Sequence, residues 1–294
     1  MRASVIIRTY NEERYLQELL AESNAQSGLD RSDYEVIVVD SGSTDRTLEI
    51  AEPAADRIVH IEKRDFSFGR SLNVGCDAAS GDVLVFISGH CVPTRDKWLS
   101  VLIEPIEQGI CSYTYGRQIG RDTTKFSEDQ LFAKFYPVTS QVPQAGFFVN
   151  NANAALSREA WLTHRFDEEL TGLEDMDLGR RLKLAGHEIG YVADAEVYHI
   201  HDESWARLTT RYEREARALN HIMPEIRFGI TDFVYYTVTS IMHDLHARKG
   251  FSRRHGTIGS ILGFRTAQYW GTYVGHHEHR KLSASKKHNY FYAK

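Results

Sequence analysis

The sequence predicts an α/β fold in which a Rossmann-like, mostly parallel sheet is flanked by helices and followed by a C-terminal helical region. Apolar runs typical of strands alternate with amphipathic stretches typical of helices over the first third of the chain. The run at 34–40 is almost continuous and β-branched, as in a strand that is covered on both faces. After about residue 203 these patterns give way to helices rich in Arg, His and Tyr.

The first part of the chain contains the clearest strand and helix patterns. Tyr15, Leu16, Leu19 and Leu20 recur at helical spacing, and a Ser or Thr precedes the second helical stretch as a cap. The expected strands cover 3–7, 34–40, 56–62 and 82–88, and the expected helices cover 11–26, 43–55 and 69–80.

The middle of the chain is more mixed, and residues 118–146 are expected to form an irregular, mobile excursion. Thr171 and Glu174 are spaced as a capping box, and the helix that they open is expected to end on Gly186. The other expected elements are a helix at 98–109, strands at 110–118, 188–193 and 195–201, and helices at 203–222, 232–250 and 258–282.

Composition excludes some classes of protein. The 294 residues fit one large α/β domain or a core domain with an appendage, and 42% hydrophobic residues provide an ample core. The net charge of -5 argues against binding to a phosphate backbone, so no nucleic-acid partner is expected. Only the tail from residue 276 onward is both basic and aromatic.

Cysteine usage and hydropathy indicate a cytoplasmic location. Cys76, Cys91 and Cys111 form neither a disulfide framework nor a CxxC pair, which favours a reducing compartment. The N-terminal residues lack the pattern of a signal peptide, and no apolar run reaches the length of a membrane-spanning helix.

Polar residues follow the expected strands at their carboxyl ends, where parallel α/β sheets bind ligands. Asp40 ends the second strand, where a carboxylate can accept from a base or a ribose. Ser41 and the next four residues form a tight polar turn that also has a purely structural explanation, the passage from strand to helix. The chain lacks GxGxxG, GxxxxGK[ST] and GxSxG motifs, which disfavours dinucleotide-binding, P-loop and hydrolase functions.

Four segments in this order resemble the family 2 glycosyltransferases of GT-A fold: VIIRTYNEERYLQELL, EVIVVDSGSTDRTLEIA, GRSLNVGCDAASGDVLVFISGHCVP and GLEDMDLGRRLKLAG. The resemblance covers residues 3–205 and implies transfer of a sugar, with inversion, from a nucleoside-diphosphate sugar to a hydroxyl of a saccharide or lipid-linked acceptor. It further implies a role in bacterial surface or exported polysaccharide synthesis. We therefore expect a catalytic domain at 1–205, divided into a nucleotide-binding half (1–95) and an acceptor half (96–205), and a helical region at 206–294.

The resemblance implies a set of donor-binding residues. Those after the first two strands would lie along the nucleotide, and those of the GRSLNVG helix would face the diphosphate or sugar; a helix cap or a solvated helix face is the alternative for each. The asparagines of the VNNAN stretch would bind sugar hydroxyls unless they only form a turn, and Trp161 would offer a stacking face. These residues are Thr9, Glu12, Asp40, Ser41, Arg70, Asn73, Asn150, Asn151 and Asn153.

The expected divalent-metal site departs from the family pattern. The family carries a DxD-like motif at the end of the fourth strand, whereas this chain has Ser88-Gly89-His90. Histidine binds Mn²⁺ through a neutral imidazole but lacks the negative charge that Mg²⁺ prefers. His199 and His201 share one face of a strand and are the expected partners of His90. A loop histidine bonded to a backbone carbonyl remains the alternative.

The LEDMD segment supplies the acids for catalysis. Asp175 matches the general base of the family, and Glu174 is a second candidate that the capping box with Thr171 would already use. Asp177 points away from Asp175 around the helix and is expected on the surface.

The C-terminal helices combine aromatic residues with Arg, Lys and His, which is typical of helices that lie in a membrane interface. Packing against the catalytic domain or against a second subunit is the alternative. Two other functions also stay open: a binding or scaffold protein that has lost its metal site, suggested by the missing carboxylate, and a sugar nucleotidyltransferase. The latter is disfavoured because a Gly-rich basic loop should follow the first strand, where this chain has RTYNEE.

Overall fold

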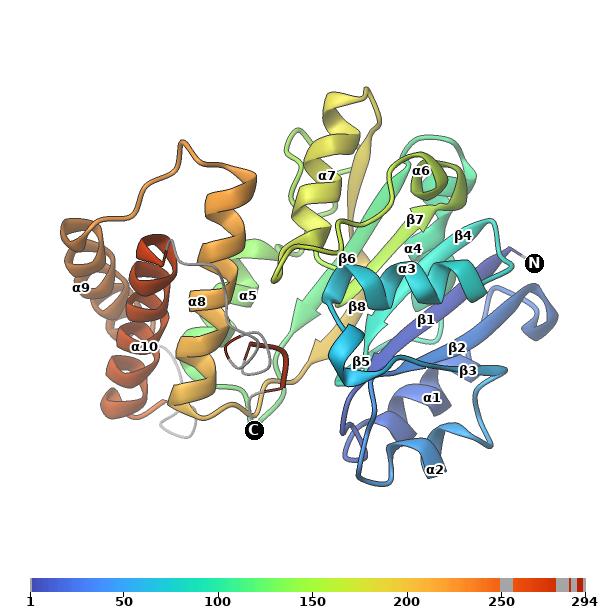
Figure 1. Ribbon diagram of the computed structural model, residues 1–294, viewed down its shortest axis with the longest axis horizontal. Coiled ribbons are helices and arrows are strands. Elements are labelled where there is room, and N and C mark those ends of the chain that lie inside the picture. The colour runs from blue at the N-terminus through green and yellow to red at the C-terminus, as the bar shows by residue number, and fades with distance from the viewer. Residues whose placement is uncertain (1, 249–255, 279–285, 287–289, 293–294) are drawn as a thin grey trace. The chain divides into compact units, whose positions relative to one another are not determined.

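The computed structural model describes residues 2–248, 256–278, 286 and 290–292 (Figure 1). Its sheet has the strand order β3-β2-β1-β4-β7-β6-β8-β5. The strands are β1 (Ala3–Thr9), β2 (Tyr34–Asp40), β3 (Arg57–His60), β4 (Val83–Ser88), β5 (Cys91–Pro93), β6 (Tyr113–Ile119), β7 (Asn153–Ser157) and β8 (Ile189–His199).

The sheet is mostly parallel, as predicted. β3, β2, β1 and β4 run parallel, and β8 is parallel to β6. β7 is antiparallel to both β4 and β6, and β5 is antiparallel to β8. The expectation of two strands at 188–193 and 195–201 is wrong, because β8 is one continuous strand. Its pairing with β6 shifts register between Gly116 and Gln118, as at a β-bulge.

The chain divides into two compact units, one formed by 1–119, 135–169 and 174–200 and the other by 120–134, 170–173 and 201–294. The helices of the first are α1 (Leu16–Asn24), α2 (Thr47–Ala51), α3 (Phe68–Ala78), α4 (Trp98–Glu107), α6 (Arg158–Thr163) and α7 (Glu174–Leu184). The second contains most of α5 (Phe126–Phe135), together with α8 (Trp205–Ile222), α9 (Ile230–Ala247) and α10 (Ile258–His277).

Residues 118–146 are not irregular throughout, because α5 lies within them. Phe126 and Phe132 are buried and form the apolar side of this helix. The many polar residues around them obscure that side in the sequence. The ends of two other expected helices, at 249–250 and 279–282, lie outside the described residues.

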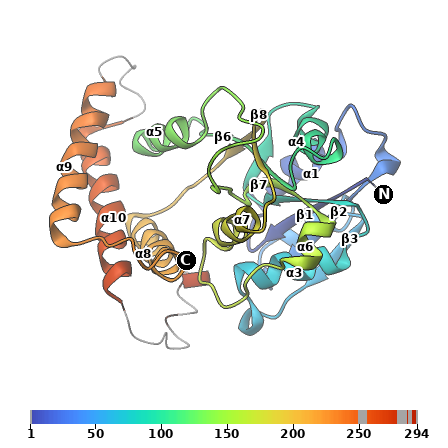
Figure 2. The same cartoon turned by 90° about the horizontal axis from the view of Figure 1, so that it is seen from above.

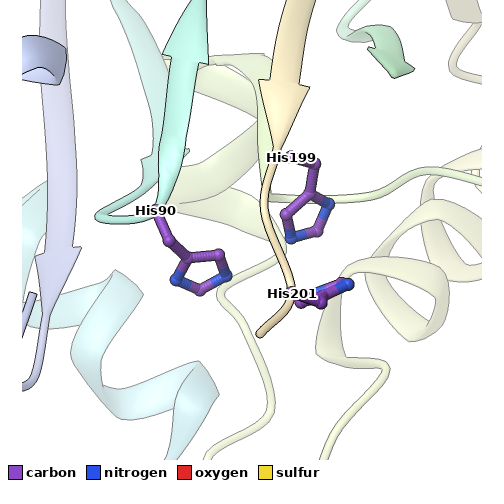
Figure 3. Close-up of side chains that lie close together, drawn as sticks. All are labelled: His90, His199 and His201. Carbon is purple, nitrogen blue, oxygen red and sulfur yellow. The ribbon is translucent and has the colours of Figure 1, made fainter. Parts of the chain in front are cut away.

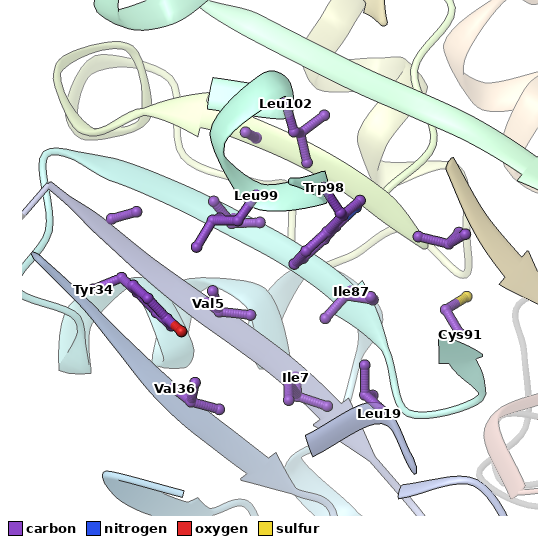
Figure 4. Packing of buried hydrophobic residues seen from close by; sticks show 14 of the residues in the cluster. Val5, Ile7, Leu19, Tyr34, Val36, Ile87, Cys91, Trp98, Leu99 and Leu102 are labelled. Carbon is purple, nitrogen blue, oxygen red and sulfur yellow. The ribbon is translucent and has the colours of Figure 1, made fainter. Parts of the chain in front are cut away.

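One face of the sheet packs against α1 and α4, and the other packs against α3 and α6 (Figure 2). Side chains alternate along a strand, so Val5 and Ile7 of β1 face α1 and α4 together with Val36 of β2. Figure 4 shows this core, in which the fully buried Trp98 of α4 fills the space above the strands. The sequence pattern of near-continuous apolar strands follows from coverage on both faces.

Gly75 lets α3 approach the other face closely. A Cβ at this position would lie 2.5 Å from Ile6 Cγ2 and 3.1 Å from Val39 Cγ2. We expect Gly75→Val to lower the free energy of unfolding by about 1–3 kcal/mol, because overpacking forces neighbouring side chains from their rotamers. Urea denaturation measures this difference. Gly146→Val is the matched control, since a Cβ there would meet no atom within 4 Å; equal stability of the two variants would contradict the packing argument.

In the second unit, α8 and α10 pack along small residues of α10. A Cβ at Gly271 or Gly275 would collide with backbone oxygens of α8, those of Thr209 and Glu213. The buried Arg265 of α10 forms a bidentate ion pair with Asp244 of α9, with Nε 2.7 Å from Oδ2 and Nη2 2.8 Å from Oδ1. None of the helices in the described part of the chain has the length and apolar character needed to span a membrane.

Candidate active site

Strand pairing brings three histidines together. β4 ends at Ser88, the chain turns through Gly89 and His90, and β5 then pairs with β8 so that Cys91 lies opposite His199. The N–H of Ile200 donates to the carbonyl of His90 at 3.2 Å. His201 follows Ile200 directly in the chain. The ligand atoms of the three histidines all lie within 4.8 Å of one another (Figure 3).

Glu12 orients His90. The Nδ1 of His90 lies 2.8 Å from Glu12 Oε1, and the carboxylate oxygen can only accept, so Nδ1 donates. Gly89 permits this contact, because a Cβ there would lie 2.7 Å from the Cγ of Glu12. The imidazole of His90 also stacks on that of His199, with ring centroids 5.2 Å apart.

A chain of hydrogen bonds fixes the tautomer of His199. The backbone N–H of Ala152 donates to Asn150 Oδ1 at 3.0 Å, so this atom is the oxygen of the amide. It also accepts from Gln118 Nε2 at 3.0 Å, which turns Gln118 Oε1 toward His199. His199 Nδ1 then donates to that oxygen at 2.6 Å.

His201 is also hydrogen-bonded through Nδ1. Its Nδ1 lies 2.8 Å from Oε1 of Glu128, a buried carboxylate on α5. All three histidines therefore direct Nδ1–H to an oxygen and carry their lone pair on Nε2. Metal-binding histidines show this arrangement, because the outer hydrogen bond sets the tautomer of the ligand.

The donor set suits a borderline divalent cation. Neutral imidazoles are ligands for ions such as Mn²⁺ and Zn²⁺, whereas Mg²⁺ prefers carboxylates and water. The residues present fit a metal site, which would be held by His90, His199 and His201.

Asp175 lies buried in the first turn of α7. Its Oδ2 accepts from the N–H of Asn151 at 2.9 Å, and its Oδ1 accepts from the N–H of Met176 at 2.8 Å. Burial and the neighbouring Glu174 carboxylate raise the pKa of Asp175 to about 7, against the opposing effect of those two N–H groups. A carboxyl with this pKa can exchange a proton near neutral pH.

Glu174 does not occupy the capping-box position that the sequence predicts. α7 begins at Glu174 itself, after Leu173 in a left-handed conformation with φ 56°, and Thr171 Oγ1 instead donates to the carbonyl of Arg214 at 3.4 Å. Glu174 Oε1 lies 3.5 Å from Nη1 of Arg8, and both side chains are largely buried. This ion pair places a cation next to the two acids.

Asp40 holds its own turn. Its Oδ2 accepts from the N–H groups of Gly42 and Ser43, at 2.9 and 3.0 Å, while Oδ1 accepts from the hydroxyls of Ser43 and Thr9. Gly42 has φ 83°, a conformation that favours glycine. Ser41 is buried and donates its N–H to the carbonyl of Thr9 at 3.0 Å. The polar turn thus has the structural role that its sequence allows.

A pocket of about 740 Å³ opens beside this turn. Lys63 crosses it toward Tyr10, with Nζ 4.8 Å from the ring centroid and 3.2 Å from the hydroxyl. His60 is exposed, and its Nδ1 lies 4.0 Å from Asp40 Oδ2. The lining residues are Asp40, Gly42, Ser43, Leu48, His60, Ile61, Glu62, Lys63 and Arg64.

Arg70 and Asn73 occupy different environments on α3. Arg70 is half exposed, with Nη1 4.0 Å from Glu168 Oε2. Asn73 is buried and makes four hydrogen bonds within the protein: its Nδ2 donates to Phe166 O and to Glu168 Oε1, and its Oδ1 accepts from Trp161 Nε1 and from the N–H of Phe166. Its amide therefore fastens the loop after α6 to α3.

The VNNAN stretch also makes internal contacts. Asn153 is 0% exposed and links α4, β6 and β8, because it accepts from Trp98 Nε1 and donates to the carbonyls of Arg117 and Ala195. Asn151 Oδ1 accepts from the hydroxyl of Tyr113 at 2.6 Å. The expectation that Trp161 stacks on a sugar is wrong, since this side chain is 1% exposed.

Three residues at the site escape prediction from the sequence alone: Arg8, Gln118 and Glu128. Arg8 is a charged residue inside an apolar strand. Because buried charges are almost always paired, this pattern could have indicated that Arg8 has an acidic partner. Gln118 and Glu128 lie in or beside a segment without clear periodicity, and only the fold brings them to the histidines.

Comparison with known proteins identifies the class. The chain is 36% identical over 277 residues to the Staphylococcus aureus poly(ribitol-phosphate) beta-N-acetylglucosaminyltransferase TarS, a match that covers 90% of this chain and 46% of TarS. It is 24% identical to the O-antigen chain rhamnosyltransferase RfbN of Salmonella typhimurium, over 98% of this chain and 99% of RfbN. The chain thus spans less than half the length of TarS.

Solved structures show the same fold. The mannosyltransferase PcManGT of Pyrobaculum calidifontis, in complex with GDP-Man and Mn²⁺, matches 93% of this chain and 84% of its own with a TM-score of 0.63 and 17% identity. The structure of S. aureus TarS 1–349 with UDP-GlcNAc matches 86% of this chain and 74% of its own with a TM-score of 0.55 and 19% identity.

The sheet and its helices have the GT-A fold of these neighbours, as the sequence predicts. The family model for "Glycosyl transferase family 2" matches residues 4–162, more than half of the chain. The chain belongs to glycosyl transferase family 2.

Proposed function

We propose that this chain transfers a sugar, with inversion, from a nucleoside-diphosphate sugar to a hydroxyl of a saccharide or lipid-linked acceptor in the synthesis of a bacterial surface polysaccharide. The observation that carries the proposal is a buried carboxyl, Asp175, held by two backbone N–H groups in a family 2 domain that also gathers three histidines at its strand ends. The names of TarS and RfbN, both glycosyltransferases of cell-surface polymers, support the class of acceptor.

Asp175 is the proposed general base. It accepts the proton of the acceptor hydroxyl as that oxygen bonds to the anomeric carbon, and the bond from this carbon to the diphosphate breaks with its electron pair leaving on the diphosphate. The N–H groups of Asn151 and Met176 hold the carboxylate in place. Glu174, paired with Arg8, tunes Asp175 electrostatically and is the second acid of the site.

The proposed metal ligands are His90, His199 and His201, with Mn²⁺ favoured over Mg²⁺ by an all-imidazole donor set. When held by these residues, a cation would neutralise charge on the leaving diphosphate. The Mn²⁺ present with PcManGT supports this choice of ion.

The pocket beside Asp40 is the proposed nucleotide site, and Asp40 lies in its wall. Thr9, Glu12 and Ser41 are proposed donor-binding residues next to it, and Arg70 is the available cation on α3. The hydrogen bonds of Asn73, Asn150 and Asn153 give these residues a supporting role in the donor site. A panel of UDP-, GDP- and dTDP-sugars, tested for thermal stabilisation and hydrolysis with Mn²⁺, identifies the donor. Failure of every nucleotide sugar to bind would overturn the proposal.

A catalytically impaired, glycosyltransferase-like binding protein is the second candidate, favoured by Ser88-Gly89-His90 in place of the DxD carboxylates. Calorimetric titration of the donor with and without Mn²⁺ separates the two. Donor binding without turnover, unaffected by metal, supports the binding protein.

We further propose a cytoplasmic enzyme that contacts the membrane peripherally through α9. Its outward face exposes Val234, Tyr235, Val238 and Met242, the last at 65%. Residues 206–294 contain fifteen Lys and Arg against six Asp and Glu, although the whole chain is acidic. An apolar helix face within a basic segment suits an anionic lipid surface.

Val238→Glu and Met242→Glu are each expected to reduce association with phosphatidylglycerol-containing liposomes by about fivefold or more, since each places a negative charge on that face. Point variants are preferable to truncation after residue 250, because truncation removes Phe264, a core residue of the second unit. Sedimentation with liposomes gives the bound fraction. Leu184→Glu is the control, as it adds the same charge to a 75% exposed leucine of α7.

Equal sedimentation of all three variants and the wild type would argue against lipid contact. If the α9 variants instead lower the molecular mass in solution, the face belongs to a homo-oligomer interface.

A further inference from the structure

A largely buried cluster of charged side chains contacts His201 at its Nδ1, and the catalytic scheme leaves this cluster without a role. It consists of Glu128 on α5, Arg211 on α8 and Glu203, which lies just before α8. All of these residues belong to the second unit of the chain.

A single oxygen joins the cluster to His201. Glu128 Oε1 accepts from His201 Nδ1 at 2.8 Å and from Arg211 Nη2 at 2.9 Å. Nε of the same guanidinium donates to Glu203 Oε2 at 3.0 Å, and Nη2 also lies 2.9 Å from that oxygen. One planar cation thus bridges two carboxylates, and the fixed fork of arginine sets the directions of these contacts more rigidly than the rotatable ammonium of a lysine would.

The contacts leave Glu128 little freedom. Its side chain is buried on α5, and Oε1 lies within 2.9 Å of both His201 Nδ1 and Arg211 Nη2. Lys125 adds to the enclosure, because its Nζ donates to the carbonyl of Glu203 at 2.8 Å.

We propose that Arg211 is a positioning residue for the metal site: it clamps Glu128, which in turn fixes the ring orientation and tautomer of His201. α8 then takes part in metal binding, although it contributes no ligand itself. This inference rests on the proposed metal role of the three histidines.

Titration of the full chain with Mn²⁺, followed by the electron paramagnetic resonance signal of free Mn²⁺, tests the inference without a turnover assay. Arg211→Met is expected to weaken Mn²⁺ binding about tenfold, within the range for lost outer contacts of metal-binding histidines. Arg217→Met is the matched control on the same helix, since Arg217 donates to the carbonyl of Glu278 and not to the cluster. Its Kd for Mn²⁺ should stay within about twofold of the wild type.

A double-mutant cycle separates positioning from general destabilisation. His201→Ala with Arg211→Met should bind Mn²⁺ no more weakly than His201→Ala alone, because both changes remove the same ligand. Wild-type affinity in Arg211→Met, or additive losses in the double variant, would overturn the inference. A wild type that binds no Mn²⁺ would instead overturn the proposed metal site itself.

If Arg211→Met fails to fold, Arg211→Lys carries the test. Lysine keeps the positive charge between Glu128 and Glu203 but cannot donate to both through a planar fork. A loss of about threefold or more in Mn²⁺ affinity is expected, and unchanged affinity would contradict the role of the clamp.

Discussion

Asp175→Asn is expected to lower kcat for sugar transfer by about 10²–10⁴-fold, the usual contribution of a general base, while the donor Kd stays within a few fold. Asparagine has the shape of aspartate and retains an oxygen for the N–H of Asn151, so the local fold should survive. The measurement is single-turnover kinetics together with donor titration.

Asp177→Asn is the matched control on the same helix. Asp177 Oδ2 pairs with Arg181 Nε at 2.8 Å, and removal of this ion pair should leave kcat nearly unchanged. Retained turnover in Asp175→Asn would exclude Asp175 as the base, and equal losses in both variants would indicate damage to α7.

The pH dependence follows from the pKa of Asp175, about 7. Activity needs the ionised form, so kcat should rise with pH through about 7 and then level off. Stability should move in the opposite direction: the folded pKa lies above the ordinary value of an aspartate, so the fold loses stability as the pH rises from that value toward 7. Asp175→Asn should therefore melt at a higher temperature than the wild type above pH 7.

His90→Ala is expected to weaken Mn²⁺-dependent donor binding by at least about tenfold, since it removes a ligand that Glu12 has oriented. Calorimetric titration of the nucleotide sugar, with and without Mn²⁺, measures the change. His164→Ala is the control, because this histidine contacts His187 and not the three-histidine cluster.

His90→Asp gives the sharper comparison. Aspartate restores the charge that hard cations prefer, so Mg²⁺ should support donor binding better in this variant than in the wild type. An unchanged metal titration in His90→Ala would rule out His90 as a ligand.

The parallel half of the sheet was predictable because its strands are buried on both faces and therefore read as unbroken apolar runs. β2, for example, is buried at every position. β7 was not predictable, since its five residues, NAALS, are too short and too small to show a strand pattern. The helix α5 escaped for a similar reason: its few buried positions, such as Phe126 and Phe132, lie among polar and charged residues.

The candidate site divides in the same way. Residues at strand ends, such as His90, can be located because the topology of a parallel sheet sends strand ends to one edge. The hydrogen-bond partners of those residues cannot be located from the sequence, because hydrogen bonds between distant segments depend on the register in which the strands pair. Asn73 and Asn153 show the limit: their polar type indicated a ligand, yet the fold uses every one of their polar atoms internally.

The amide chain from Ala152 through Asn150 and Gln118 to His199 has a consequence for redesign of the donor pocket. Each amide in it has one allowed orientation, set by a backbone N–H at the far end. An Asn150→Asp exchange leaves that acceptor in place, whereas Gln118→Glu supplies a charge and stabilises a doubly protonated imidazole at His199. A mutation at Asn150 thus alters the orientation of the Gln118 amide and, through it, the hydrogen bond to a histidine on another strand.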